Sequence, residues 1–303
     1  MADPLSQDRF IAGEERWATF PGGHRMRYLF LKAKRQTSRP PVIFIHGFLG
    51  YSFSWRFNLD EFSRERDVYA IDLLGIGDSD RPPRGLFSFS FPDSARRVLD
   101  WIHELGLSNV DLIGTSHGGA VSMFMAVIDR AEHRNAIGRL ILVAPANPYS
   151  RAGRKRIWFF NTAFGAWLLK TSGGIDRIKD LSLERMYGDR SKLTHATREG
   201  YRRIMQHPKS FEYALDVIKT WHSDMDKLLG HLASIADIPT LLVWGARDIT
   251  VPTETATELQ KHFRRAELVI LPGTGHLPYE EDPEPFNHEV LSWLDRAAPQ
   301  AGL

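Results

Sequence analysis

The chain has 303 residues, 43% hydrophobic and 25% charged, a balance typical of soluble globular proteins. It contains no cysteine, which excludes disulfides, thiolate nucleophiles and cysteine-ligated metal centres. The formal net charge is only +2, but residues 147–234 carry 16 Lys and Arg against 9 Asp and Glu, or +7, which leaves about −5 for the rest. Such a basic segment can steer anionic substrates or contact a membrane surface, although a solvated helical face is the more frequent explanation.

The length is near the upper limit for one hydrophobic core, so it predicts one domain with a sizeable insertion. The first residues contain no apolar run of the kind found in signal peptides. No stretch approaches the roughly 18 apolar residues that cross a bilayer. We therefore expect a cytoplasmic protein without a transmembrane segment.

Up to residue 146, the sequence alternates between strands and helices. Residues 15–20 and 25–31, around a Pro-Gly-Gly turn, alternate apolar and polar side chains and predict a hairpin. Short, wholly or largely apolar runs are typical of strands covered on both faces; they occupy residues 42–45, 68–71, 110–113 and 139–144. Helices are expected between them, over 53–63, from a cap at Asp93 to about 105, and over 121–128.

The alternation stops at Pro145, and the sequence to about Ile235 is helical in pattern and rich in aromatic residues. It then resumes with strands over 239–244 and 266–271 and helices over 253–262 and 283–296. Repeated strand–helix units predict an α/β protein with a mostly parallel central sheet and helices on both faces. Residues 1–146 and 235–303 would form this core, and residues 147–234 an inserted helical cap.

The strand ending at residue 113 runs into Gly114-Thr115-Ser116-His117-Gly118, and an apolar helix follows. This is the Gly-x-Ser-x-Gly pattern in its required setting of strand, sharp turn and helix. A turn this tight strains the serine backbone, and glycines two positions away on either side avoid collisions with the neighbouring strand and helix. Ser116 would then stand at the end of the sheet, beside helix N-terminal amides that favour an anion.

A serine hydroxyl needs a base to accept its proton and a third group to orient that base. Asp248 follows the 239–244 strand, and His276 follows the 266–271 strand. Because parallel strands present their carboxyl ends at one edge of a sheet, both side chains should lie at the same edge as Ser116.

These features together resemble the α/β-hydrolase fold superfamily, in its serine-nucleophile, esterase- and lipase-like branch with a helical cap. Five motifs occur in the family's order: His46-Gly47, the loop 72–79, the turn at Ser116, the Asp248 loop and Gly275-His276. The resemblance implies the α/β-hydrolase fold and a triad with Ser116 as nucleophile, His276 as general base and Asp248 as its orienting acid. It also implies an oxyanion hole made by the backbone N–H groups of Phe48 and His117.

Departures from the family's other branches narrow the chemistry. The chain has no His-Gly-Gly-Gly motif, which argues against the hormone-sensitive-lipase-like branch. Ser116 stands where dehalogenases and epoxide hydrolases of this fold carry an aspartate, which argues against those chemistries. The stretch after the 139–144 strand offers no alternative acid for the triad.

Other side chains have less defined expected roles. His46 should shape the oxyanion turn, and Asp72 should tie down its own loop. Trp55 suits either the core or a pocket wall. Aromatic residues of the insertion could contact an apolar substrate, although packing of the cap onto the core explains most of them as well; they are Trp158, Phe160, Phe164, Trp167 and Trp221.

The sequence therefore predicts a serine hydrolase, first of all a carboxylesterase acting on a small-molecule ester with an apolar acyl or aryl group. A C–C bond hydrolase of diketone ring-cleavage products and a cofactor-free perhydrolase use the same triad and remain alternatives. A ligand receptor on a hydrolase scaffold is the non-enzymatic alternative. We expect no cofactor, no metal and no nucleic acid, because the chain lacks a phosphate loop, a zinc-protease helix and a nucleic-acid-binding module. The oligomeric state stays open.

Overall fold

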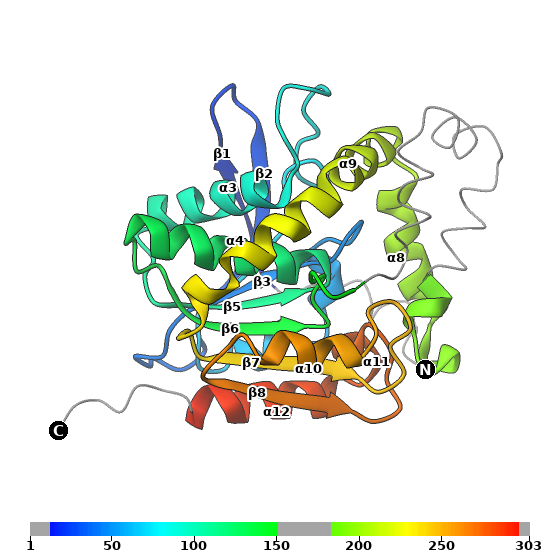
Figure 1. Ribbon diagram of the computed structural model, residues 1–303. Coiled ribbons are helices and arrows are strands. Elements are labelled where there is room, and N and C mark those ends of the chain that lie inside the picture. The colour runs from blue at the N-terminus through cyan, green and yellow to red at the C-terminus, as the bar shows by residue number, and fades with distance from the viewer. Residues whose placement is uncertain (1–12, 151–182, 297–303) are drawn as a thin grey trace.

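The computed structural model describes residues 13–150 and 183–296. Within this part of the chain, one eight-stranded sheet has the order β1-β2-β4-β3-β5-β6-β7-β8 (Figure 1). β2 pairs antiparallel with both β1 and β4, and all other neighbours are parallel. The strands are β1 (Glu14–Thr19), β2 (Arg25–Leu31), β3 (Val42–Ile45), β4 (Val68–Ile71), β5 (Val110–Thr115), β6 (Ile137–Val143), β7 (Thr240–Gly245) and β8 (Ala266–Leu271).

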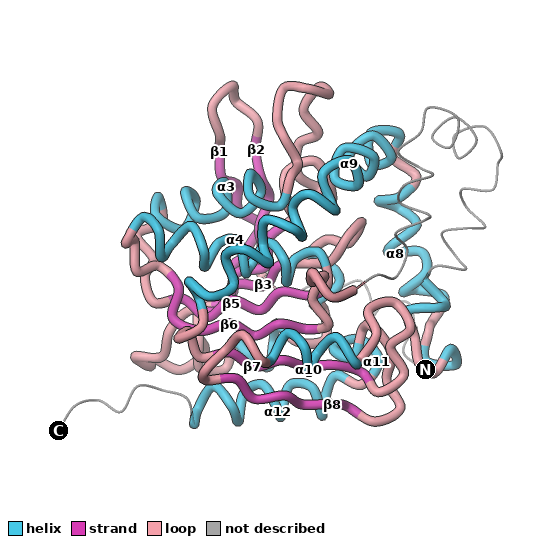
Figure 2. The backbone as a smooth tube through the Cα atoms, viewed as in Figure 1, coloured by secondary structure: helices cyan, strands magenta, loops and turns pink. Residues whose placement is uncertain are grey.

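Helices cover both faces of the sheet, with α4 and α10 in front of it and α12 behind it (Figure 2). The helices of the core are α2 (Leu59–Phe62), α3 (Phe91–Glu104), α4 (His117–Glu132), α10 (Glu254–Gln260), α11 (Pro278–Glu281) and α12 (Pro283–Arg296). Short 3₁₀ turns are η1 (Ser52–Trp55), η2 (Arg190–Lys192) and η3 (Leu232–Ile235). This layered arrangement is the α/β-hydrolase fold that the sequence predicts.

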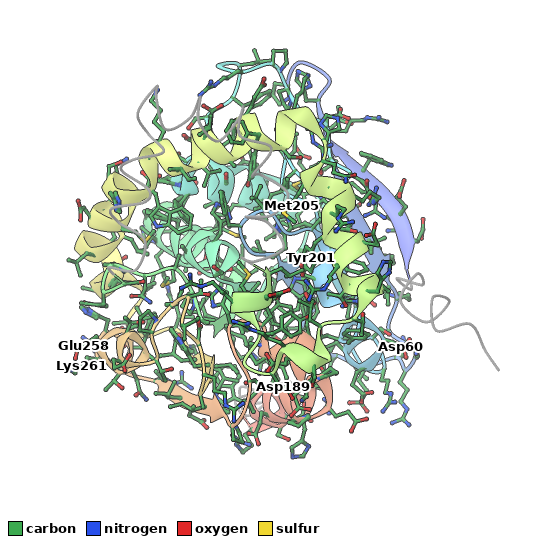
Figure 3. The ribbon with its side chains drawn as sticks, turned by 90° about the vertical axis from the view of Figure 1, so that its right-hand side faces the viewer. Asp60, Asp189, Tyr201, Met205, Glu258 and Lys261 are labelled. Carbon is green, nitrogen blue, oxygen red and sulfur yellow. The ribbon has the colours of Figure 1, made fainter. Side chains whose placement is uncertain are left out.

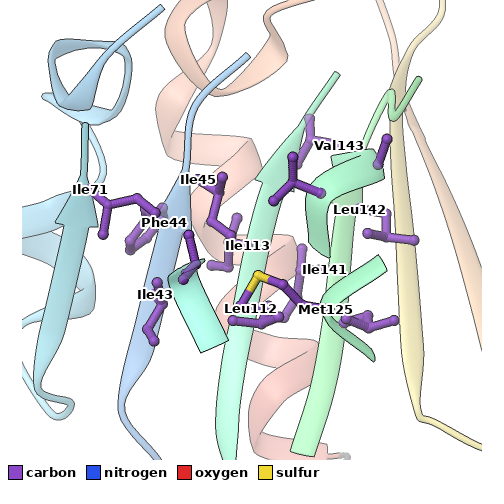
Figure 4. Packing of buried hydrophobic residues seen from close by; sticks show 14 of the residues in the cluster. Ile43, Phe44, Ile45, Ile71, Leu112, Ile113, Met125, Ile141, Leu142 and Val143 are labelled. Carbon is purple, nitrogen blue, oxygen red and sulfur yellow. The ribbon is translucent and has the colours of Figure 1, made fainter. Parts of the chain in front are cut away.

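The central parallel strands are buried on both faces, which is why their sequences are largely apolar. Figure 4 shows their side chains interdigitating with those of α4, for example Phe44, Ile113 and Met125. Asp111 is the exception within the apolar run of β5. It is fully buried, and Arg139 on the adjacent strand β6 binds both of its carboxylate oxygens over 2.6 Å.

The strands β6 and β7 are neighbours in the sheet, although almost a hundred residues separate them in sequence. The described part of this connection contains α8 (His195–Met205) and α9 (Pro208–His231). α8 lies beyond the carboxyl ends of β5 and β6, and α9 passes alongside α3 and α4 (Figure 1). The connection therefore reaches the sheet edge at which the site is expected.

The helix starts differ in detail from the sequence prediction. Ser90, not Asp93, is the N-cap of α3: its hydroxyl accepts from the Asp93 amide (3.2 Å) and donates to the Asp93 carboxylate (2.6 Å). The Ser90 hydroxyl thus caps the helix in the usual way, while the Ser90 amide donates to Ser88 Oγ (3.2 Å). The segment predicted as one helix over 53–63 is instead the 3₁₀ turn η1 followed by the short helix α2.

Candidate active site

Ser116 occupies the sharp turn between β5 and α4. Its backbone has φ 50° and ψ −117°, a conformation that an L-residue adopts only when its surroundings enforce it. The surroundings here are hydrogen bonds: the Ser116 amide donates to the carbonyl oxygen of Val143 (3.0 Å), and the Ser116 carbonyl oxygen accepts from the amide of Ala146 (2.8 Å). Both partners lie at the end of β6, so the neighbouring strand holds the serine in place.

The glycines around Ser116 are required by space, as predicted. A Cβ on Gly114 would overlap the hydroxyl of Ser122 in α4, and a Cβ on Gly118 would overlap the carbonyl oxygens of Ile45 and His46 at the end of β3. The helix α4 therefore starts in direct contact with the backbone of β3.

His276 and Asp248 form a buried pair on the loops after β8 and β7. The imidazole Nδ1 lies 2.7 Å from Asp248 Oδ2, and the two side chains are 2% and 0% exposed. The other oxygen of Asp248 accepts from the amides of Thr250 (2.7 Å) and Val251 (3.0 Å), which fixes the carboxylate. Asp248 thus orients the ring, and Nε2 is the ring nitrogen left for a substrate or nucleophile.

Ser116 and His276 line one cavity of about 200 Å³ at the carboxyl edge of the sheet. No hydrogen bond joins the serine hydroxyl to the imidazole among the described residues. The cavity also contains Gly47 and Phe48, from the loop after β3, and Trp221 from α9. The structure thus gathers residues from four separate predicted loops and from the segment between β6 and β7 around one space.

The loop after β3 is shaped by His46, as expected. Its Nε2 accepts a hydrogen bond from the amide of Leu73 (3.0 Å), so the ring proton must be on Nδ1, which lies 2.8 Å from the Gly47 carbonyl oxygen. Complete burial lowers the pKa of His46, which keeps the ring neutral. A neutral, doubly bonded imidazole here holds the turn that leads into Phe48.

The amides of Phe48 and His117 are free to bind an anion. Within the described chain neither donates a backbone hydrogen bond, and that of His117 is at the first position of α4, where the helix itself offers no acceptor. Gly47 approaches Ser116 closely, since a Cβ on Gly47 would lie 3.4 Å from that of the serine. These positions fit the oxyanion hole that the family resemblance implies.

The imidazole of His117 has no evident chemical role. It is fully buried, its ring centroid lies 4.7 Å from that of Phe91 and 6.1 Å from that of Trp221, and neither of its nitrogens finds a partner among the described residues. Burial lowers the pKa of His117 to about 3. Its ring is therefore a neutral part of the aromatic packing below the cavity.

Asp72 holds its own loop together, as the sequence indicates. One carboxylate oxygen accepts from the Ser52 amide (2.7 Å), and the other accepts from the Asp78 amide (2.9 Å) and from Arg27 (3.2 Å). The side chain is fully buried and is not among the residues that line the cavity.

The predicted substrate-contacting aromatics have different outcomes. Trp221 lines the cavity. Trp55 does not: it is fully buried in the core, where its ring packs against Tyr279 and Phe44 with centroid separations of 4.2 and 4.9 Å. Of the two places that the sequence left open for it, the pocket wall is therefore wrong. The remaining four lie outside the described residues: Trp158, Phe160, Phe164 and Trp167.

Several residues of the site were not predicted from the sequence. His222, Met225 and Asp226 accompany Trp221 on one face of α9 and line the cavity; their one-, four- and five-residue spacing from Trp221 was a signal that could have found them. Met186 also lines it, and no pattern in the sequence marks that position.

Among the described residues, no group of three or more His, Asp or Glu side chains could hold a metal ion, and none of the described helices has the length and apolarity needed to cross a bilayer.

Comparisons with known proteins agree with this architecture. A family model described as the alpha/beta hydrolase fold matches residues 40–283. Epoxide hydrolase 3 of Xenopus tropicalis is 27% identical over 285 residues, which cover 90% of this chain and 75% of that protein. A thermophilic esterase from Thermogutta terrifontis superposes with a TM-score of 0.74 at 22% identity, covering 93% of this chain and 98% of that one. A mutant haloalkane dehalogenase from Agrobacterium tumefaciens gives 0.77 at 17% identity, covering 97% and 100%. The chain belongs to the α/β hydrolase fold family.

Proposed function

We propose that this protein is a serine carboxylesterase that cleaves small-molecule esters with an apolar acyl or aryl group. One observation carries the proposal: Ser116, held at a strained turn, lines the same cavity as His276, whose Nδ1 is bound to the buried carboxylate of Asp248. A nucleophile, a base and an orienting acid in this order are the parts that acyl transfer needs.

In the proposed reaction, His276 Nε2 takes the proton of Ser116 as Oγ bonds to the ester carbonyl carbon. The carbonyl electron pair moves onto oxygen, where the amides of Phe48 and His117 stabilise it. The imidazolium, stabilised by Asp248, then gives its proton to the alcohol oxygen as the C–O bond breaks. Water attacks the acyl-enzyme by the same steps and releases the acid. Removing one oxyanion donor commonly lowers the rate about 10²–10³-fold, so each of the two amides should contribute substantially to the rate.

The nucleophile favours an ester over an epoxide. A carboxylate that opens an epoxide forms an ester, which water can hydrolyse through its carbonyl group. A serine hydroxyl would form an ether, which has no carbonyl group and would leave the enzyme blocked. Ser116 therefore supports acyl transfer, although the chain is similar to epoxide hydrolases.

We also propose that residues 147–234 form a cap over this site. Met186 and Trp221, both from this segment, line the cavity together with residues of the sheet loops. β6 and β7 remain neighbours in the sheet on either side of the segment, as expected for an insertion.

The test compares the wild-type protein with Ser116→Ala on p-nitrophenyl butyrate, together with labelling by a fluorophosphonate. We expect ester turnover and covalent labelling at Ser116 in the wild type, and neither in a folded Ser116→Ala protein. Equal turnover in the variant would end the proposal.

A panel with styrene oxide, a vinylogous diketone and acetate with hydrogen peroxide separates the alternatives. Faster cleavage of the diketone would assign a C–C bond hydrolase, and peracid formation a perhydrolase. Turnover of the epoxide without that of the ester would contradict acyl transfer. A protein that binds ligands and is neither labelled nor active would be a receptor.

A further inference from the structure

A second cavity of about 260 Å³ lies beside the active-site cavity. Four residues border both spaces: Gly47, Phe48, Met186 and Leu277. The second cavity contains neither Ser116 nor His276, and apart from the shared four it is lined by Leu49, Gly50, Ser54, Leu183, Tyr201, Met205 and Tyr279. It is therefore a side chamber that opens at the oxyanion turn.

The walls of the side chamber are almost entirely apolar. Ser54, Tyr201 and Tyr279 bring hydroxyl groups to it, and the Tyr201 hydroxyl binds Ser54 Oγ (2.9 Å) and the buried carboxylate of Glu280. Tyr201 and Met205 both lie on α8 (Figure 3), so this helix forms part of the chamber wall. A ligand group in this space would meet mainly methyl, thioether and ring surfaces.

The active-site cavity differs in character. Asn147, His222 and Asp226 line it in addition to the reacting groups. In acyl transfer the leaving alcohol must stay beside His276, which protonates it, so the leaving group belongs in this more polar space. The acyl chain must then leave the carbonyl carbon in another direction, and the side chamber starts where the carbonyl oxygen would bind, at Phe48.

We propose that the side chamber is the acyl subsite and that the substrates are esters of unbranched, medium-length aliphatic acids with a polar alcohol. This proposal rests on the proposed esterase function. It adds that the acyl side of the ester is the apolar one and that the side chains of α8 limit the length of the acyl chain. Burial of one methylene group in an apolar site is worth about a fourfold gain in kcat/KM. Each added methylene should give this gain until the chain meets the side chains of α8.

The experiment measures kcat/KM for p-nitrophenyl esters from acetate to laurate. The wild type should gain about fourfold per methylene, reach a maximum at intermediate length and then decline. Met205→Trp fills the chamber and should lower the ratio of octanoate to acetate turnover at least about tenfold. Met205→Ala enlarges the chamber and should move the maximum to longer chains. The two variants should therefore shift the preferred acyl-chain length in opposite directions.

Leu229→Trp is the matched control, because this residue is exposed on α9 away from both cavities. It should keep the wild-type chain-length profile. If the wild type hydrolyses these esters and neither Met205 variant changes the profile, the acyl-subsite assignment is wrong while the esterase proposal stands. If the wild type hydrolyses none of them, the esterase proposal itself fails, and the subsite with it.

Discussion

The backbone amide of His276 donates to the carbonyl oxygen of Met186 over 2.6 Å. This bond joins the loop of the proposed general base to the segment between β6 and β7. Glu281, buried in α11, adds three more: its carboxylate accepts from the amides of Gly275 (3.0 Å), Gly188 (2.9 Å) and Asp189 (3.0 Å). One buried carboxylate thus clamps the histidine loop and the insertion together.

Replacing Glu281 by Ala should therefore impair both stability and catalysis. The buried amide of Gly275 and the half-buried amides of Gly188 and Asp189 lose their acceptor, and one unsatisfied buried group costs about 1–3 kcal/mol. We expect the free energy of unfolding to fall by about 3 kcal/mol or more in urea titrations. Turnover should fall through kcat, on the order of tenfold to a hundredfold, with KM changed much less, because the base is displaced while the cavity walls remain.

Glu284→Ala is the control for this experiment, since Glu284 is exposed on α12 a few residues away. It should match the wild type in both measurements. A Glu281→Ala protein that is destabilised but has the wild-type kcat would show that the clamp is structural only.

Asp248→Asn tests how the imidazole is oriented. Asp248 Oδ2 holds the ring through Nδ1, and Oδ1 is fixed by two backbone amides, so an asparagine can occupy the same space. Its NH₂ group would favour the wrong tautomer of His276. On this geometry kcat should fall on the order of 10³–10⁴-fold with little change in unfolding free energy. A loss below tenfold would mean that another group orients the base.

The strands and the mostly parallel class of the sheet could be predicted from sequence, because apolar runs mark the strands and strand–helix alternation marks parallel connections. Val42–Ile45 and Val68–Ile71 were placed at their observed bounds, since four consecutive buried residues leave little ambiguity. Short helices were harder. The four-residue helix Pro278–Glu281 was missed, because it is stabilised by contacts across the fold and has no helical periodicity of its own.

The proposed triad could be located because each member follows a strand that the pattern identifies. Glu281 could not, since its role depends on three amides from two distant segments. Trp55 could not be placed for a similar reason: a tryptophan after a Gly-rich turn has the same local sequence in the core, where it lies, as in a pocket wall. Long-range packing decides such cases, and a single sequence does not record it.

The pair Asp111 and Arg139 gives a prediction on stability alone. Asp111 is fully buried and is also bound by Arg66 (3.1 Å). Removing the Asp111 carboxylate therefore takes this partner away from two guanidinium groups in the core. Asp111→Ala should lower the free energy of unfolding by about 3–5 kcal/mol. The triple variant Asp111→Leu, Arg66→Met, Arg139→Met should recover most of this, because it leaves no unpaired charge. A loss of under 1 kcal/mol in Asp111→Ala would contradict the pairing.

Gly118→Ala tests the close contact between α4 and β3. The new Cβ would overlap the carbonyl oxygens of Ile45 and His46, so the start of α4 must move. The amide of His117 moves with it, and we expect a loss of about 10²-fold or more in kcat, the size of one lost oxyanion donor. Gly230→Ala in α9 is the matched control: a Cβ there meets nothing within 4 Å, and alanine should stabilise that helix by up to about 1 kcal/mol without changing kcat.

The buried ring of His117 makes stability depend on pH. Burial lowers its pKa from 6.5 to about 3 in the folded protein. Below pH 6.5 the unfolded chain therefore binds a proton that the folded chain does not. The contribution of His117 to the free energy of unfolding is therefore complete above pH 6.5 and is lost progressively as the pH falls towards 3. Between pH 7 and pH 5 the loss amounts to roughly 2 kcal/mol.

His117→Phe should remove this loss and keep the reaction. Phenylalanine suits the aromatic surroundings of Phe91 and Trp221, and it leaves the backbone amide that we assign to the oxyanion hole in place. Urea titrations at pH 7, 6 and 5 should show a shallower decline for the variant than for the wild type, by roughly 2 kcal/mol over this range. The exposed His103 on α3, replaced in the same way, should follow the wild-type curve. If His117→Phe also abolished ester turnover, the imidazole itself would take part in the chemistry, and the assignment of its amide alone would be wrong.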